Sequence, residues 1–221
     1  MALNKIQSLV LELVAASPLS KNFYWTDGTL LAERYLHHRK SYDVDLFTEK
    51  PFMYETVAPL IQELKEKTGL RSIEEKKVFD RWEFFIHNHD EVRVEFVHYN
   101  FPALKSRKRI NGIFADSLED LAANKTMAVV DRHEPKDVVD IFFLMRDRKF
   151  DSKKLLRLAK KKFGLAMDES TLLGQILFGA KRLLEIQPML YGTKPEQLAL
   201  IQEIQNYFKH QSTRYLRSLL D

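Results

Sequence analysis

Apolar residues recur every three to four positions along several stretches of the chain, which is the spacing of one buried helix face. The pattern predicts helices over residues 1–16 and 54–67. We expect the first helix to end at Ser17, because Pro18 disfavours helical backbone at the residue before it. Both helices carry charged residues between the apolar ones, so each is expected to lie on the surface of a folded core.

Shorter runs rich in β-branched and aromatic residues predict strands. A helix of good helix formers, residues 29–38, separates the first two strands. The last three runs are expected to form an antiparallel meander beside the second strand, with His89-Asp90 as a turn. The predicted strands cover residues 22–26, 42–47, 71–79, 82–87 and 92–98.

From Ser117 onward the pattern becomes helical, and Ser117 and Asp120 form a start similar to a capping box. Pro135 suits the first turn of the next helix. The sequence therefore predicts an α+β fold, in which a mixed sheet flanked by helices is followed by a C-terminal helical region. We expect an α/β domain over residues 1–116 and a helical domain over 117–221. The predicted helices of the second domain cover residues 117–131, 136–146, 151–163, 168–186 and 195–220.

Composition excludes several classes of protein. The 221 residues include no cysteine, which excludes disulfides, thiolate zinc sites and a cysteine nucleophile. No stretch reaches the roughly 18 apolar residues of a membrane span, and Glu12 interrupts the N-terminal stretch where a signal peptide is most apolar. We therefore expect a cytoplasmic protein that does not span a membrane.

The net charge of +4 is unevenly distributed, because two clusters hold much of the basic excess. A solvated surface is the default interpretation of each cluster, and a phosphate-binding patch is the alternative. The first cluster lies in one loop and the second in one predicted helix: Lys105, Arg107, Lys108 and Arg109, and Lys153, Lys154, Arg157, Lys160, Lys161 and Lys162.

Asp43 and Asp45 are the candidate metal ligands. Side chains alternate along a strand, so these two carboxylates share one face while Val44 points into the core. Paired carboxylates suit Mg²⁺, which binds hard oxygen ligands. Glu95, on a predicted neighbouring strand, is the candidate third ligand. The structural alternative is a solvated strand edge, or charge pairs with basic neighbours.

A second constellation lies at the junction of two predicted helices. Lys125 and Arg132 are two helical turns apart and share a face, as do Asp137 and Asp140 on the next helix. One interpretation is an interhelical salt bridge. The other is a phosphate contact by Lys125, with Asp137 orienting it or acting as a base. The spacing alone leaves both open.

Taken together, these residues resemble the AbiEii/AbiGii-type nucleotidyltransferase toxins of type IV toxin–antitoxin systems. The resemblance covers roughly residues 22–145. Two motifs carry it, in the family's order: Thr26-Asp27-Gly28-Thr29 followed by Arg39, Ser41, Asp43 and Asp45, and then Asp120-Leu121, Lys125, Arg132, Lys136-Asp137 and Asp140.

The resemblance implies transfer of a nucleotide from a nucleoside triphosphate to an acceptor, in some members the end of a tRNA, with Mg²⁺ held by the aspartates. It implies a cognate antitoxin as protein partner. The implied catalytic residues are Asp43, Asp45, Lys125 and Asp137, and the implied nucleotide-binding residues are Gly28, Thr29, Arg39 and Ser41.

Asp27 departs from the family pattern, which has glycine at this position. A carboxylate there is expected to cap the free N–H groups that a triphosphate would use, and to repel the phosphates. The departure indicates a weakened or altered triphosphate site. The alternatives are a non-catalytic member that binds protein or RNA, and an enzyme that modifies a small molecule such as an aminoglycoside.

Overall fold

The computed structural model describes residues 3–87 and 91–220, so the expected turn at His89-Asp90 lies outside the described residues. The chain forms two compact units. The first comprises the described residues up to Tyr35 and those of Ser41–Ser117, and the second comprises Leu36–Lys40 and those of Leu118–Asp221. No helix among the described residues is long and apolar enough to cross a membrane.

The first unit is a mixed sheet with helices on its faces, which confirms the expected α+β class. The described strands follow the order β3-β4-β5-β2-β1-β7-β6. The meander β3-β4-β5 is antiparallel, and β5 runs parallel to β2. The strands are β1 (Tyr24–Thr26), β2 (Asp43–Thr48), β3 (Glu74–Val78), β4 (Arg81–His87), β5 (Glu91–His98), β6 (Lys108–Ile110) and β7 (Ile113–Ala115).

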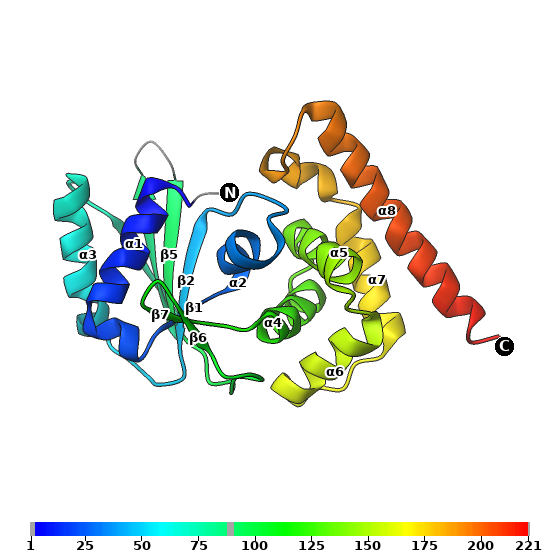
Figure 1. The fold of residues 1–221 in the computed structure, drawn as a ribbon, viewed down its shortest axis with the longest axis horizontal. Coiled ribbons are helices and arrows are strands. Elements are labelled where there is room, and N and C mark those ends of the chain that lie inside the picture. The colour runs from blue at the N-terminus through cyan, green and yellow to red at the C-terminus, as the bar shows by residue number, and fades with distance from the viewer. Residues whose placement is uncertain (1–2, 88–90, 221) are drawn as a thin grey trace. The chain divides into compact units, whose positions relative to one another are not determined.

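Helices α1 (Lys5–Ala16) and α3 (Tyr54–Thr68) lie on one face of this sheet, and α2 (Asp27–Leu30) lies on the other (Figure 1). The side chains of Val44 and Leu46 are fully buried in the apolar face, as their alternation predicts. In α3 the apolar positions spaced three and four apart are buried against the sheet, which confirms the predicted helix. They are Val57, Leu60, Ile61 and Leu64.

The helix expected over residues 29–38 is different in the structure. A short 3₁₀ turn (Pro18–Lys21) precedes β1, and α2 begins at Asp27 and passes into a π-helical segment, Leu31–Leu36. A second unpredicted feature is the β6–β7 hairpin, in which β7 pairs in parallel with β1. The sequence analysis expected only the loop that carries the first basic cluster.

The second unit is helical, and its helices begin close to the predicted starts. Asp151 and Asp168 cap α6 and α7 by accepting hydrogen bonds from backbone N–H groups. After α7 the chain forms a 3₁₀ segment, Leu183–Met189, where the prediction continued the helix. The helices are α4 (Leu118–Asp131), α5 (Pro135–Arg148), α6 (Ser152–Phe163), α7 (Glu169–Ala180) and α8 (Lys194–Arg217).

Candidate functional site

The polar face of the sheet carries a row of carboxylates. In the strand register, Asp45 of β2 stands opposite Glu95 of β5 and opposite Thr26 of β1. Glu95 in turn stands opposite Glu83 of β4. Because directly opposite residues share a face, four neighbouring strands present these polar side chains side by side. The predicted pairing of the Asp43 strand with the Glu95 strand is therefore present.

Asp43 and Asp45 share this face, while Val44 between them is buried in the core. Asp45 is only 6% exposed, whereas Asp43 at the start of β2 is half-buried. Burial of one carboxylate beside others is unfavourable unless cations compensate it. The two aspartates thus occupy different environments although they lie one residue apart.

Two arginines compensate for the negative charge of these carboxylates, and Arg93 makes the shorter contacts. Its Nη2 lies 2.9 Å from Oδ2 of Asp43 and 2.8 Å from Oε1 of Glu95, so one nitrogen bridges the two carboxylates. Arg81 approaches the other Glu95 oxygen, with Nη1 3.4 Å from Oε2. Glu95, the predicted third metal ligand, is therefore bound by two arginines.

Asp45 has the most perturbed environment of this row. Burial raises the pKa of its carboxyl well above the usual range, and the negative charges of Asp27, Glu95 and Asp43 raise it further. Asp27 contributes more than the other two carboxylates. Asp27 is thus close enough to act on the buried aspartate of β2.

The backbone at Asp27 adopts a conformation typical of glycine. Its φ angle is 58°, in the left-handed region that side chains other than those of Asn and Asp rarely occupy. Asp27 is the first residue of α2, and the N-cap position belongs to Thr26. The expectation that Asp27 precedes the helix as its cap is therefore wrong by one position, because the turn begins earlier.

The predicted turn residues Gly28 and Thr29 are buried in α2. The Thr29 hydroxyl lies 2.9 Å from Oγ of Ser41 and also contacts the carbonyl oxygen of Asp43. The carbonyl of Ser41 accepts a hydrogen bond of 2.9 Å from Gln7. These contacts fix the chain that enters β2 and hold α2 against it.

The second unit contains a buried ion network around Asp140. Nζ of Lys125 lies 3.1 Å from Asp137 and 3.2 Å from Asp140. Arg39 binds Asp140 through two nitrogens, at 2.7 and 2.9 Å, and His38 Nε2 lies 2.6 Å from it. Of these residues, only Asp137 shares helix α5 with Asp140. Lys125 lies in α4, and His38 and Arg39 lie in the segment Leu36–Lys40.

The network joins α4, α5 and the segment Leu36–Lys40, and two of its members, Asp140 and His38, have shifted pKa values. The charges of Arg39 and Lys125 hold the pKa of Asp140 well below its usual range, although its burial opposes them. Burial lowers the pKa of His38, against the hydrogen bond that Asp140 accepts from its ring, which would raise it. Arg132, the other predicted cation, binds Asp137 through two nitrogens at 2.8 and 3.0 Å. The interhelical salt bridge of the sequence analysis is therefore present.

Two residues of the first unit escaped the sequence analysis or received too little weight: Arg93 and Asp116. Arg93 was one of the basic neighbours that could pair with the carboxylates, and its bridge from Glu95 to Asp43 was not foreseen because it depends on the strand register. Asp116 was not considered: it accepts hydrogen bonds from Thr26 at 2.7 Å and from Arg107 at 2.8 Å. The sequence does not indicate that Asp116 lies beside Thr26, because this contact depends on the pairing of β7 with β1, which was not predicted.

Comparison with known proteins identifies the family of this chain. The family model described as the nucleotidyl transferase AbiEii toxin of the type IV toxin–antitoxin system matches residues 11–214. The chain belongs to the AbiEii family. An uncharacterized protein of Aquifex aeolicus (strain VF5) is 34% identical over 165 residues, which cover 73% of this chain and 76% of that protein.

Two solved structures share the fold of this AbiEii family member. A protein of H. pylori assigned as a nucleotidyltransferase is 16% identical, with a TM-score of 0.59 over 96% of this chain and 95% of that one. JHP933 of Helicobacter pylori is 18% identical, with a TM-score of 0.57 over 98% and 96%. At these identities the likeness concerns the fold alone.

The aspartates of this AbiEii family member have the chemistry that Mg²⁺ needs. Among the residues that the structure describes, no group of three or more His, Asp or Glu side chains is placed to hold a metal ion. Mg²⁺ does not need such a cage, because it is usually held by one or two carboxylates together with substrate phosphates and water. The carboxylates of Asp43 and Asp45 are therefore a donor set whose chemistry fits a magnesium ion.

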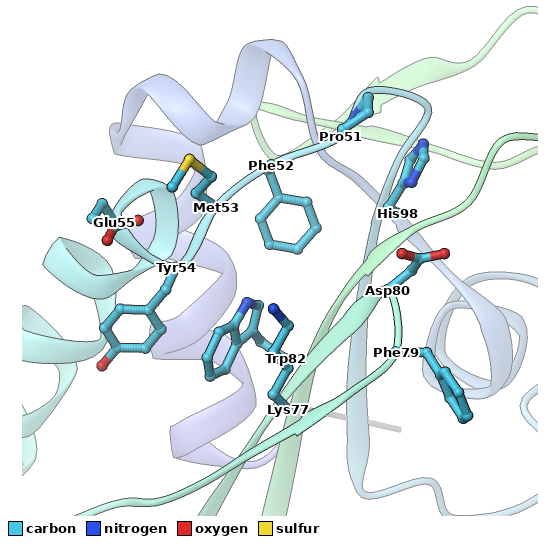
Figure 2. A pocket seen from close by; sticks show the side chains of 10 residues that line it. All are labelled: Pro51, Phe52, Met53, Tyr54, Glu55, Lys77, Phe79, Asp80, Trp82 and His98. Carbon is cyan, nitrogen blue, oxygen red and sulfur yellow. The ribbon is translucent and has the colours of Figure 1, made fainter.

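A cavity of about 320 Å³ lies elsewhere in the first unit (Figure 2). Its walls come from the segment before α3, from the β3–β4 hairpin and from the end of β5, and Phe52 and Trp82 contribute aromatic rings to it. No predicted site residue lines this cavity. The candidate site is therefore the polar face of β2.

Proposed function

We propose that this protein transfers a nucleotide from a nucleoside triphosphate to an acceptor in an Mg²⁺-dependent reaction, and that the acceptor is an RNA such as tRNA. The observation that carries the proposal is the placement of Asp43 and Asp45 on one sheet face beside the turn that begins α2. Membership of a nucleotidyltransferase toxin family supports it. In this proposal the protein acts in the cytoplasm with a cognate antitoxin.

Asp43 and Asp45 are the proposed metal ligands. Bound magnesium would neutralise phosphate charge and stabilise the attacking and leaving oxygens of an in-line displacement. The third carboxylate oxygen comes from Glu95 or from Asp27. Glu95 is already bound by Arg93 and Arg81, so these ion pairs would have to open before Glu95 could bind a metal.

The buried turn of α2 would position the triphosphate. N–H groups at a helix start favour phosphate oxygens, and Gly28 places no side chain between the backbone and the substrate. Thr29 and Ser41 fix this turn against the start of β2 through their hydroxyl contact. Arg93 would release Asp43 when the metal binds, since both compete for the same carboxylate.

Lys125 and Asp137 are proposed to be positioning residues. Lys125 is 1% exposed and its ammonium group already binds two carboxylates. The network that they form includes Arg39. Along the chain, Arg39 lies two residues before Ser41 and four before Asp43, where β2 begins. The proposed role of this network is to hold the segment Leu36–Lys40 in place through the contact of Arg39 with Asp140.

The second candidate function is that of a non-catalytic binding protein. Asp27 favours it, because its charge lies near Asp45 and would repel a triphosphate. A metal ion bound between these carboxylates would remove that repulsion, so the two candidates differ in their response to Mg²⁺.

Transfer of label from α-³²P nucleoside triphosphates to total tRNA tests the proposal. Wild type is expected to label RNA only when Mg²⁺ is present, and Asp43→Asn to lose about 100-fold or more, since even residues that support metal ligands contribute 10–100-fold. Glu91→Gln, a change at an exposed carboxylate, is the matched control. Equal labelling by wild type and Asp43→Asn would refute the metal-ligand assignment.

A further inference from the structure

Helix α6 presents four cations on one exposed face. Lys153, Arg157, Lys160 and Lys161 are all exposed and fall within a narrow arc of the helix, at intervals of four, three and one residues. From first to last they span about 12 Å along the helix axis. These four residues are called the basic stripe below.

The stripe has no acidic partner within the part of the chain that the structure describes. No salt bridge involves any of its four cations, whereas Arg107 of the other basic cluster binds Glu49 and Asp116. The remaining two lysines of the α6 cluster are engaged differently. Nζ of Lys162 lies 3.0 Å from Asp120 in the interior, and that of Lys154 lies 3.6 Å from the centre of the Phe150 ring.

The helix beneath the stripe is firmly held. Leu155 and Ala159 are buried on the opposite side of α6, as is the Lys162–Asp120 pair. Asp151 caps the first turn, and Gly164 ends the helix in a left-handed conformation. Like charges at positions three and four apart destabilise an isolated helix. The packing of the opposite face therefore compensates for a repulsion that a bound polyanion would relieve.

The surroundings of the stripe identify the class of polyanion. A membrane-binding helix would need an apolar face for the lipid, but the apolar face of α6 is buried in the protein. A protein interface would have an apolar or aromatic centre, from which charged residues are depleted, and the stripe contains only cations. A row of cations without such a centre suits a phosphodiester backbone, which is bound through charge and not through sequence.

We propose that the basic stripe of α6 binds the phosphate backbone of an RNA. The inference rests on the proposed function for the role of that RNA as acceptor, and on the charge and packing of α6 for its binding. Each cation neutralises about one phosphate, and contact with several phosphates makes affinity fall steeply with salt.

The test is fluorescence anisotropy with a labelled 20-nucleotide single-stranded RNA, in the absence of triphosphate, between 50 and 200 mM NaCl. The stripe variant carries Lys153→Gln, Arg157→Gln, Lys160→Gln and Lys161→Gln. The matched control removes four exposed cations elsewhere, with the same change in net charge: Lys67→Gln, Lys194→Gln, Lys209→Gln and Arg217→Gln. Circular dichroism of both variants verifies that each is folded.

We expect the slope of log affinity against log salt to fall by about 3 in the stripe variant, from roughly 0.7 per contacted phosphate of a single strand. The control is expected to keep the wild-type slope. Equal loss in both variants, or no loss in the stripe variant, would overturn the inference. Binding of poly-glutamate in place of RNA would overturn it as well, by indicating an acidic protein partner.

The same assay with single-stranded DNA distinguishes the two polymers that share this backbone chemistry: equal affinity for DNA would contradict a preference for RNA. Repeating the RNA titration with Asp43→Asn separates this inference from the proposed function. Retained binding with lost label transfer would support both. Wild-type protein that binds RNA but transfers no label would refute only the proposed transferase, and transfer without stripe-dependent binding would refute only this inference.

Discussion

Asp27 lies in α2 and Asp45 lies in β2, and the negative charge of Asp27 acts on the carboxyl of Asp45. Burial raises the pKa of the Asp45 carboxyl, and among the neighbouring charges that of Asp27 raises it most. Asp27 also holds a left-handed backbone conformation in which glycine is unstrained. The residue that departs from the family pattern therefore bears on both the backbone and the electrostatics of the candidate site.

Replacing Asp27 by glycine should stabilise the metal-free protein. The change removes a left-handed non-glycine residue and a repulsive charge, and we expect a gain of about 1 kcal/mol, limited by the greater freedom of glycine in the unfolded chain. Urea denaturation in EDTA measures it. Asp27→Asn separates the two causes, because asparagine removes the charge and keeps the side chain. A less stable Asp27→Gly protein in EDTA would contradict this explanation.

Replacing Lys125 by alanine should destabilise the second unit strongly. The change leaves the buried carboxylates of Asp137 and Asp140 with one cation fewer, and loss of one partner of a buried ion pair costs about 3–5 kcal/mol. The melting temperature should fall accordingly. Lys153→Ala on the exposed face of α6 is the control and should shift stability by less than about 0.5 kcal/mol. A stable Lys125→Ala protein that had lost activity would instead support a direct catalytic role.

The contribution of His38 to stability should be lost as the pH decreases below the unfolded pKa of histidine, about 6.5. His38 is buried with a lowered pKa, so the unfolded chain binds a proton that the folded protein takes up only at lower pH. Its Nδ1 atom has no hydrogen-bond partner among the described residues, which makes protonation there unfavourable.

Denaturation of wild type and His38→Gln between pH 5 and 8 measures this contribution. The variant should show a weaker dependence on pH than wild type through the window below 6.5. Asp140 does not add to this window, because its pKa lies well below its usual range and it stays ionised. Parallel pH profiles for the two proteins would exclude His38 as the cause.

Replacing Phe79 by asparagine should stabilise the first unit. Phe79 lies in the β3–β4 turn with a φ of 50°, its side chain is 93% exposed, and it points away from Phe52 and Trp82 (Figure 2). Asparagine tolerates the left-handed conformation at little cost, so we expect a gain of roughly 0.5–1 kcal/mol. Leu165→Asn, at an exposed residue without a positive φ, should leave the melting temperature nearly unchanged. An unstable Phe79→Asn protein would mean that the exposed ring is needed for folding.

The elements with a regular hydrophobic pattern were predictable from the sequence. The alternation of Asp43, Val44 and Asp45 specified which side chains enter the core, and the apolar spacing of residues 54–67 specified α3. In both elements the pattern is a local property of the chain. It specifies which face of the strand or helix is buried, and it does so independently of which element packs against that face. The class of fold and the family followed from such elements and from two motifs.

What the sequence could not show depends on contacts between distant residues. The bridge from Arg93 to Asp43 exists because β5 and β2 pair in one particular register. The grouping of residues 36–40 with the C-terminal helices depends on Arg39 binding Asp140, which lies 101 positions away. The β6–β7 hairpin was missed because each strand is three residues long, and because β7 is held by its pairing with the distant strand β1.

Isothermal titration of the four nucleoside triphosphates, with and without Mg²⁺, into wild type and Asp45→Asn tests the central claim most directly. Glu83→Gln, which changes another buried carboxylate of the same row, is the matched control. The account predicts Mg²⁺-dependent binding of at least one triphosphate to wild type and Glu83→Gln, and its loss in Asp45→Asn. Equal binding by all three proteins, or binding that does not depend on Mg²⁺, would contradict it.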